Sequence, residues 1–92
     1  MRGAEKATID HETIRNWVEA RGGQPAAVQG TGDRGDPGVL RIGFPGDRGE
    51  EPLAWLPWDD WFEKFDEAEL SFRYEDVEDS SFYELVYRAA AG

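Results

Sequence analysis

The apolar residues of the chain recur with two different periods, and the first of these predicts a helix near the N-terminus. Ile14, Trp17 and Val18 occur at i, i+3 and i+4, the spacing that places side chains on one face of a helix. Asp10 precedes them and suits a helix cap, because its carboxylate can accept from the unpaired amides of the first turn. Gly22 follows and favours an end to the helix, since glycine adopts a left-handed conformation at little cost.

A second helix is predicted by a run in which aromatic and acidic residues alternate with helical spacing. Four aromatic residues form its apolar face: Trp58, Trp61, Phe62 and Phe65. Five acids fill the other side: Asp59, Asp60, Glu63, Asp66 and Glu67. Pro57 suits the first helical position, where its missing amide costs nothing. We therefore expect the rings to point inward and the carboxylates to face water.

Alternation with a period of two predicts strands within residues 39–44, 70–75 and 82–88, and residues 26–30 could form a further short strand. The order of elements is then helix, hairpin, helix, hairpin, and a shift of 44 residues aligns the two halves, as an internal duplication would. This order predicts an α+β fold, α-β-β-α-β-β, with two helices packed on one face of a four-stranded antiparallel sheet. The sequence interpretation places this single domain at residues 10–88, between tails at 1–9 and 89–92.

The charge is distributed unevenly and suggests a class of partner. The formal net charge is −10, yet residues 1–46 carry six acids and six bases, whereas residues 47–84 carry fourteen acids and three bases. Such a field repels the phosphates of nucleic acids and attracts basic surfaces. We therefore expect a basic protein surface as a partner and no direct binding of nucleic acid. The simpler interpretation is a solvated face that keeps the protein in solution.

Other features of the composition narrow the class of protein. The chain of 92 residues suits one domain and contains no cysteine, which excludes disulfides and thiolate metal sites. No apolar run approaches the roughly 20 residues that a membrane helix needs, and the first six residues are polar. These features predict a cytoplasmic protein that does not bind a membrane.

The motifs that could carry chemistry each have a simpler explanation. Residues 30–35 fit the G-x-G-x-x-G pattern, but a further strand follows them, whereas a phosphate loop must lead into a helix. The carboxylates of the second helix lie on its wet face, without the pocket that acid–base chemistry requires. The acidic turn at 76–80 lacks the EF-hand spacing, and His11 is the only histidine. We expect no catalytic residue, no metal and no cofactor.

Three stretches carry a resemblance to a known family: residues 12–26 (ETIRNWVEARGGQPA), 36–42 (DPGVLRI) and 58–65 (WDDWFEKF). They resemble a family of small uncharacterised bacterial proteins, many of which carry the label 1,4-alpha-glucan branching enzyme. The resemblance covers most of residues 10–88 and implies a glucan-related enzyme as one alternative. Branching enzymes, however, build their active site on a barrel of about 250 residues, and this chain has 92.

Two positions depart from the family pattern, and one of them is a candidate contact residue. Pro57 stands where a serine is usual, and Trp55 stands where a polar residue is usual. We expect Trp55 to be exposed. The candidate interaction surface consists of Trp55 and the acids of the second helix: Asp59, Asp60, Glu63, Asp66 and Glu67. The first hypothesis is a non-enzymatic protein-interaction or accessory module, ahead of a small homo-oligomer and of the glucan-related enzyme.

Overall fold

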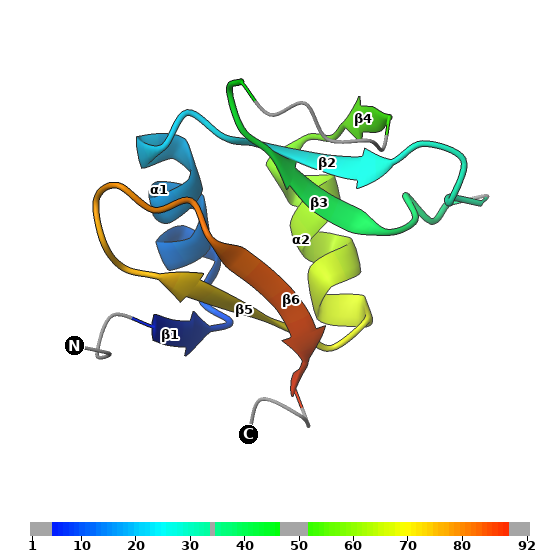
Figure 1. The fold of residues 1–92 in the computed structure, drawn as a ribbon. Coiled ribbons are helices and arrows are strands. Elements are labelled where there is room, and N and C mark those ends of the chain that lie inside the picture. Colours follow the sequence, from blue (N-terminus) through cyan, green and yellow to red (C-terminus); the bar gives the residue numbers. More distant parts are fainter. Residues whose placement is uncertain (1–4, 34, 47–51, 89–92) are drawn as a thin grey trace.

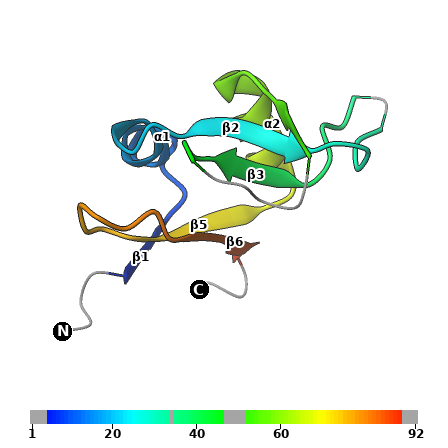
Figure 2. The same cartoon turned by 45° about the horizontal axis from the view of Figure 1, so that its top comes forward.

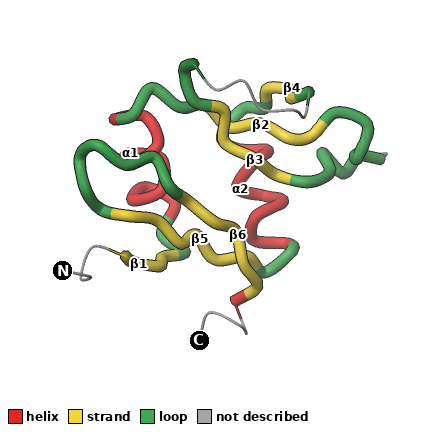
Figure 3. Tube along the Cα trace, viewed as in Figure 1, coloured by secondary structure: helices red, strands yellow, loops and turns green. Residues whose placement is uncertain are grey.

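The computed structural model describes residues 5–33, 35–46 and 52–88, which form an α+β fold of two helices and six strands (Figure 1). In chain order these are β1 (Glu5–Thr8), α1 (His11–Ala20), β2 (Gln24–Val28), β3 (Leu40–Gly43), β4 (Leu53–Trp55), α2 (Trp58–Glu67), β5 (Leu70–Glu75) and β6 (Tyr83–Tyr87). The distribution of helix and strand along the chain can be followed in Figure 3.

The prediction of one four-stranded sheet with both helices on one face is wrong. The strands form two separate antiparallel sheets of three strands each, ordered β1-β5-β6 and β3-β2-β4. The predicted hairpins exist, but they do not pair with each other. Each hairpin instead gains a third strand that the apolar pattern does not predict, because β1 reads Glu-Lys-Ala-Thr and β4 has only three residues.

The two added strands cross between the halves of the chain. β1 precedes α1 but pairs with β5, so that Thr8 lies opposite Phe72. β4 precedes α2 but pairs with β2, so that Trp55 lies opposite Ala26. Residues 5–8 thus belong to a sheet, although they fall in the segment that the sequence interpretation assigned to a tail. Residues 1–4 and 89–92 lie outside the described residues.

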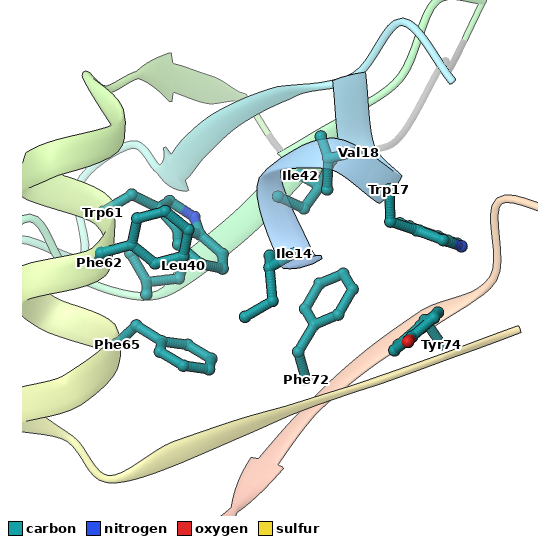
Figure 4. Close-up of a cluster of buried hydrophobic side chains, with 10 residues drawn as sticks. All are labelled: Ile14, Trp17, Val18, Leu40, Ile42, Trp61, Phe62, Phe65, Phe72 and Tyr74. Atoms are coloured by element: carbon teal, nitrogen blue, oxygen red, sulfur yellow. The ribbon is translucent and has the colours of Figure 1, made fainter. Parts of the chain in front are cut away.

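The hydrophobic core lies between the two sheets, which are stacked one above the other in Figure 2. Its buried side chains come from both helices and from the strands β3 and β5, and Figure 4 shows them converging: Ile14, Trp17, Val18, Leu40, Ile42, Trp61, Phe62, Phe65, Phe72 and Tyr74. The predicted apolar faces of both helices are therefore confirmed. Trp58 is only half-buried and stacks on Phe62, with ring centroids 5.1 Å apart.

The polar atoms of the core aromatic residues bond to the backbone of other elements. Nε1 of Trp17 donates to the carbonyl of Glu75 at 2.9 Å, and Nε1 of Trp61 donates to the carbonyl of Arg41 at 3.1 Å. The hydroxyl of Tyr83, on β6, accepts from the N–H of Ile42, on β3, at 2.9 Å. Because a buried donor without a partner is costly, the indole bonds fix the two tryptophan rings. The Tyr83 bond joins the two sheets.

The helix starts agree with one expectation from the sequence and correct another. The carboxylate of Asp10 caps α1 and accepts from the N–H of Thr13 at 2.9 Å. Pro57 does not occupy the first helical position of α2 but the cap before it, with an extended ψ of 150°. The fixed φ of proline suits both positions, so the sequence alone does not distinguish them.

Replacing Phe72 by alanine should destabilise the whole fold. Phe72 is fully buried between the sheets, and deleting such a ring removes its burial and leaves a cavity. We expect the free energy of unfolding to fall by about 3–5 kcal/mol, measured by urea denaturation. Phe82→Ala is the matched control, because Phe82 is 46% exposed. A similar loss for the two variants would contradict the assignment of Phe72 to the core.

Candidate functional site: an acidic hollow

The exposed side of α2 faces the loop between β2 and β3 across a hollow of about 390 Å³. Five carboxylates line this hollow, from two separate segments: Asp33 and Asp36 of the loop and Asp60, Glu63 and Glu67 of the helix. We call it the acidic hollow. Lys64 also lines it, and is the one base among the described lining residues. The hollow therefore carries a marked excess of negative charge.

Helix geometry and a tight turn together place the carboxylates. Asp60, Glu63 and Glu67 occur at i, i+3 and i+7, a spacing that keeps them on one side of α2. In the loop, the backbone N–H of Asp33 donates to the carbonyl of Asp36, and that of Asp36 donates to the carbonyl of Asp33, both at 2.8 Å. Gly35 allows this turn because its φ is +75°, in the region that glycine adopts at little cost.

Asp36 is held by a backbone N–H of its own loop and by Lys64 of α2. Its carboxylate accepts from the backbone N–H of Gly38 at 2.9 Å and from the ammonium of Lys64 at about 3 Å. The Gly38 bond first, and then Lys64, hold the pKa of Asp36 below its ordinary value. Asp36 is therefore ionised at neutral pH. It forms an ion pair with Lys64, whose side chain is only 22% exposed.

The structure brings together half of the candidate surface that the sequence predicts. Asp60, Glu63 and Glu67 line the acidic hollow, whereas Asp59, Asp66 and Trp55 are not among its lining residues. Sequence analysis missed Asp33 and Asp36, because they belong to a glycine-rich loop that it set aside. The only local signal of a site here was the presence of two acids in one turn. The approach of this turn to α2 is a tertiary contact, which a local pattern does not reveal.

Asp66 connects α2 with α1 and with the residue that follows β6. Its carboxylate lies 2.9 Å from Nε2 of His11, the first residue of α1, and accepts from Nη2 of Arg88 at 2.7 Å. The His11 ring stacks on Phe62, with centroids 4.1 Å apart. Partial burial raises the pKa of Asp66, but the bonds from His11 and Arg88 outweigh this effect and hold the pKa below its ordinary value.

Trp55 does not line the acidic hollow and lies on the face of its sheet that points away from the core. Within sheet β3-β2-β4, Trp55 and Arg41 both lie opposite Ala26, and hence share one face, while the neighbouring Leu40 points into the core. Trp55 is 60% exposed, as expected from the sequence. Its indole lies so close to Gly43 that a Cβ on that residue would be 2.6 Å from the ring. The missing side chain of Gly43 thus leaves room for the ring.

The arrangement offers no support for a catalytic role of the α2 carboxylates. Trp61, Phe62 and Phe65 point into the core instead of lining a groove, and Asp59 and Glu63 are exposed. Among residues 5–33, 35–46 and 52–88, no group of three or more His, Asp or Glu side chains is arranged to hold a metal ion. In the same residues, no helix is long and apolar enough to cross a membrane.

Comparisons of this chain with known protein families, with curated protein sequences and with solved structures found no match. The resemblance to the small bacterial family, and the glucan-related activity that it implies, therefore stay predictions from the sequence. The geometry of the site carries the functional argument.

Replacing Asp66 by asparagine should change how stability depends on pH. A carboxylate whose pKa is lower in the folded state stabilises the protein above the ordinary pKa of aspartate, about 3.9, and this contribution is lost as the pH falls through the folded value. We expect Asp66→Asn to be less stable than the parent at neutral pH, by under about 1 kcal/mol since the pair is half exposed. The difference should shrink at acidic pH. Urea denaturation across the pH range measures this difference in stability, with the exposed Asp79→Asn as the control. A difference that is independent of pH would contradict the stabilising role of the Asp66 carboxylate.

Replacing Gly43 by alanine should displace the Trp55 ring. The new methyl group would overlap the indole, and overpacking of this kind costs about 1–3 kcal/mol. We expect a lower midpoint of urea unfolding and a shift in the tryptophan fluorescence spectrum. The double variant Gly43→Ala with Trp55→Ala should recover part of the loss relative to Trp55→Ala alone. If the two substitutions are additive, the ring does not rest on Gly43.

Proposed function

We propose that this protein is a non-enzymatic interaction module that binds a basic protein surface through the acidic hollow. The observation that carries the proposal is the convergence of five carboxylates, from the 31–38 loop and from α2, on one hollow with a single lysine among its described lining residues. A lysine or arginine side chain of the partner would enter this hollow and donate charge-assisted hydrogen bonds to carboxylates on both walls.

The charge of the whole chain supports the same partner class. Residues 47–84 carry fourteen acids and three bases, which give the second half of the chain a negative field. Such a field raises the rate at which a basic surface is encountered and opposes the approach of nucleic-acid phosphates. The side chains of Asp33, Asp60, Glu63 and Glu67 are exposed, so each ion pair would add little by itself. The affinity would come from several pairs formed together, and the cytoplasm would be the place of binding.

Removing the helix carboxylates should weaken binding to a lysine-rich peptide. The test variant carries Asp60→Asn, Glu63→Gln and Glu67→Gln, and the control carries Asp59→Asn, Glu12→Gln and Glu78→Gln, three exposed acids that do not line the hollow. The two variants have the same net charge. At low ionic strength we expect the test variant to bind about tenfold more weakly than the parent, because it loses several exposed ion pairs. The control should lose no more than about threefold, as expected for a change in the long-range field only.

Calorimetric titration at low and at physiological ionic strength measures both affinities. Binding by the parent should weaken as salt is added, since salt screens exposed charges. Equal losses in the two variants would show that only the overall charge attracts the peptide, and would overturn the assignment to the hollow. A peptide in which glutamate replaces every lysine should not bind.

A further inference from the structure

β6 is an edge strand of the sheet β1-β5-β6, and a hollow of about 400 Å³ lies between it and β3 of the other sheet. We call it the flank hollow. The two strands are joined at one end, where the Tyr83 hydroxyl bonds to the backbone of Ile42. Away from this bond their ribbons diverge in Figure 1, and the hollow is lined by Leu40 of β3 and by Leu85 and Tyr87 of β6. The edge of β6 that does not pair with β5 therefore borders an open space.

The hydrogen bonds between β5 and β6 show which backbone groups of β6 point away from β5. The N–H of Arg88, directly after β6, donates to the carbonyl of Glu69, directly before β5, at 2.8 Å. Bonded and non-bonded positions alternate along an antiparallel pair, so Val86 bonds to β5, whereas Leu85 and Tyr87 turn their N–H and C=O groups to the outer edge. None of the described residues forms a hydrogen bond with these outer groups. β6 thus presents donors and acceptors that are a template for another strand.

The facing edge of β3 has the same character. The N–H of Val28 donates to the carbonyl of Val39 at 2.8 Å, so the next residue, Leu40, turns its backbone groups away from β2. Ile42 lies on the same side, and there its N–H meets the Tyr83 hydroxyl instead of a strand. An extended segment in the flank hollow would therefore find backbone partners on β6 and have Leu40 of β3 on its other side.

Apolar side chains line the hollow beside this edge. Leu70 and Leu85 lie on the same face of their sheet as Phe72, which is fully buried in the core. They are nevertheless only half-buried, and both line the flank hollow. Because side chains alternate along a strand, a segment paired with β6 would place every second side chain over these leucines. Unpaired backbone with apolar side chains beside it is the arrangement on which strand addition depends.

The flank hollow adjoins the acidic hollow, because Asp36 and Lys64 line both. Tyr87 also lines the flank hollow, whereas Tyr83, at the joined end of the strands, is not among the described lining residues of either. The two hollows therefore meet on the side of Tyr87. A segment that leaves the edge of β6 there enters the acidic hollow with its five carboxylates, and basic residues of the segment would complement this charge.

We propose that the partner of the acidic hollow is an extended peptide segment that pairs with β6 as an additional strand and places basic residues in the acidic hollow. This role of β6 rests on the proposed function, to which it adds the conformation of the partner. Antiparallel pairing is the more stable per residue, and a segment antiparallel to β6 begins at the Tyr87 end. The basic residues of the partner therefore precede its apolar residues.

Two synthetic peptides test the added strand on the full chain. In the strand peptide a run of lysines precedes alternating valine and threonine, and in the linker peptide the same lysines precede glycine and serine. By calorimetric titration we expect the strand peptide to bind at least about tenfold more tightly, because it adds backbone hydrogen bonds and buries apolar side chains. Glutamates in place of its lysines should weaken it by at least about tenfold at low ionic strength. Equal binding of the glutamate form would overturn the placement of basic residues in the acidic hollow.

Amide hydrogen exchange locates the bound strand peptide. The N–H groups of Leu85 and Tyr87 have no partner among the described residues, so we expect them to exchange rapidly in the protein alone and at least about tenfold more slowly in the complex. Val86, which bonds to β5, is the internal control and should change less. Protection of Leu85 and Tyr87 in the protein alone would overturn the proposal, because the edge would already be paired, by a second copy of the chain if sedimentation shows a dimer.

A proline at the outer edge should block the added strand. Tyr87→Pro removes an N–H that takes no part in the pairing with β5, and edge strands tolerate proline at such positions. Its matched control, Tyr87→Ala, removes the exposed side chain and keeps the N–H. We expect Tyr87→Pro to bind the strand peptide at least about tenfold more weakly than Tyr87→Ala does, while the two bind the linker peptide equally. Equal binding of the strand peptide by two folded variants would overturn the proposal.

Methylated peptides keep the test open if the unfolding midpoint shows that Tyr87→Pro is not folded. The strand peptide is N-methylated either at its valines or at its threonines, and the parent protein is titrated with each form. Because the N–H groups of alternate residues point to opposite edges of a strand, only one of the two forms loses the donors that face β6. We expect that form to bind at least about tenfold more weakly than the other.

The results distinguish this proposal from the proposed function. Equal affinity of the strand and linker peptides, equal losses in the two methylated forms, or unchanged exchange at Leu85 and Tyr87 would each overturn the added strand. These outcomes would leave the binding of a lysine-rich peptide to the acidic hollow intact. Failure of the lysine-rich peptide to bind at all would overturn both.

Discussion

The pairing of strands across the two halves of the chain is the constraint on which the rest of the structure depends. β1 completes the sheet of β5 and β6, and β4 completes the sheet of β2 and β3. A hairpin of two strands is at best marginally stable alone, whereas three strands packed on other elements can persist. Because each half supplies the third strand of the other half's sheet, neither sheet can form from one half alone. The core then closes between them, with Ile14 and Trp17 of α1 packed in the same cluster as Phe65 of α2 and Phe72 of β5.

The acidic hollow arises at the junction that this exchange creates. It has one wall from the loop between β2 and β3, in the first half, and one wall from α2, in the second. The Tyr83–Ile42 bond joins β6 of the second half to β3 of the first. Any change that separates the halves would thus alter the acidic hollow.

The sequence predicts those elements whose own residues determine their burial. A helix with Trp61, Phe62 and Phe65 on one face has a single way to bury three rings, so the orientation of α2 could be read from its spacing, and α1 followed from Ile14 and Val18 in the same way. The strands β1 and β4 could not be predicted, because their stability comes from the partner strand and not from an alternating pattern of their own. Without them, two hairpins with apolar faces were wrongly joined into one sheet.

The same distinction applies to the residues of the candidate site. Exposure of Asp60, Glu63 and Glu67 follows from their place on an amphipathic helix, and the sequence predicts it. Their meeting with Asp33 and Asp36 depends on how a loop of the first half is placed over a helix of the second, which no local pattern contains.

Lys64 shows how the same placement gives a residue its role. In the sequence it is one base among the acids of α2. In the structure its ammonium holds Asp36 at about 3 Å, and so ties the loop of the first half to the helix of the second. It also offsets a single charge among the five carboxylates of the acidic hollow. The excess of negative charge in the hollow therefore persists with Lys64 in place.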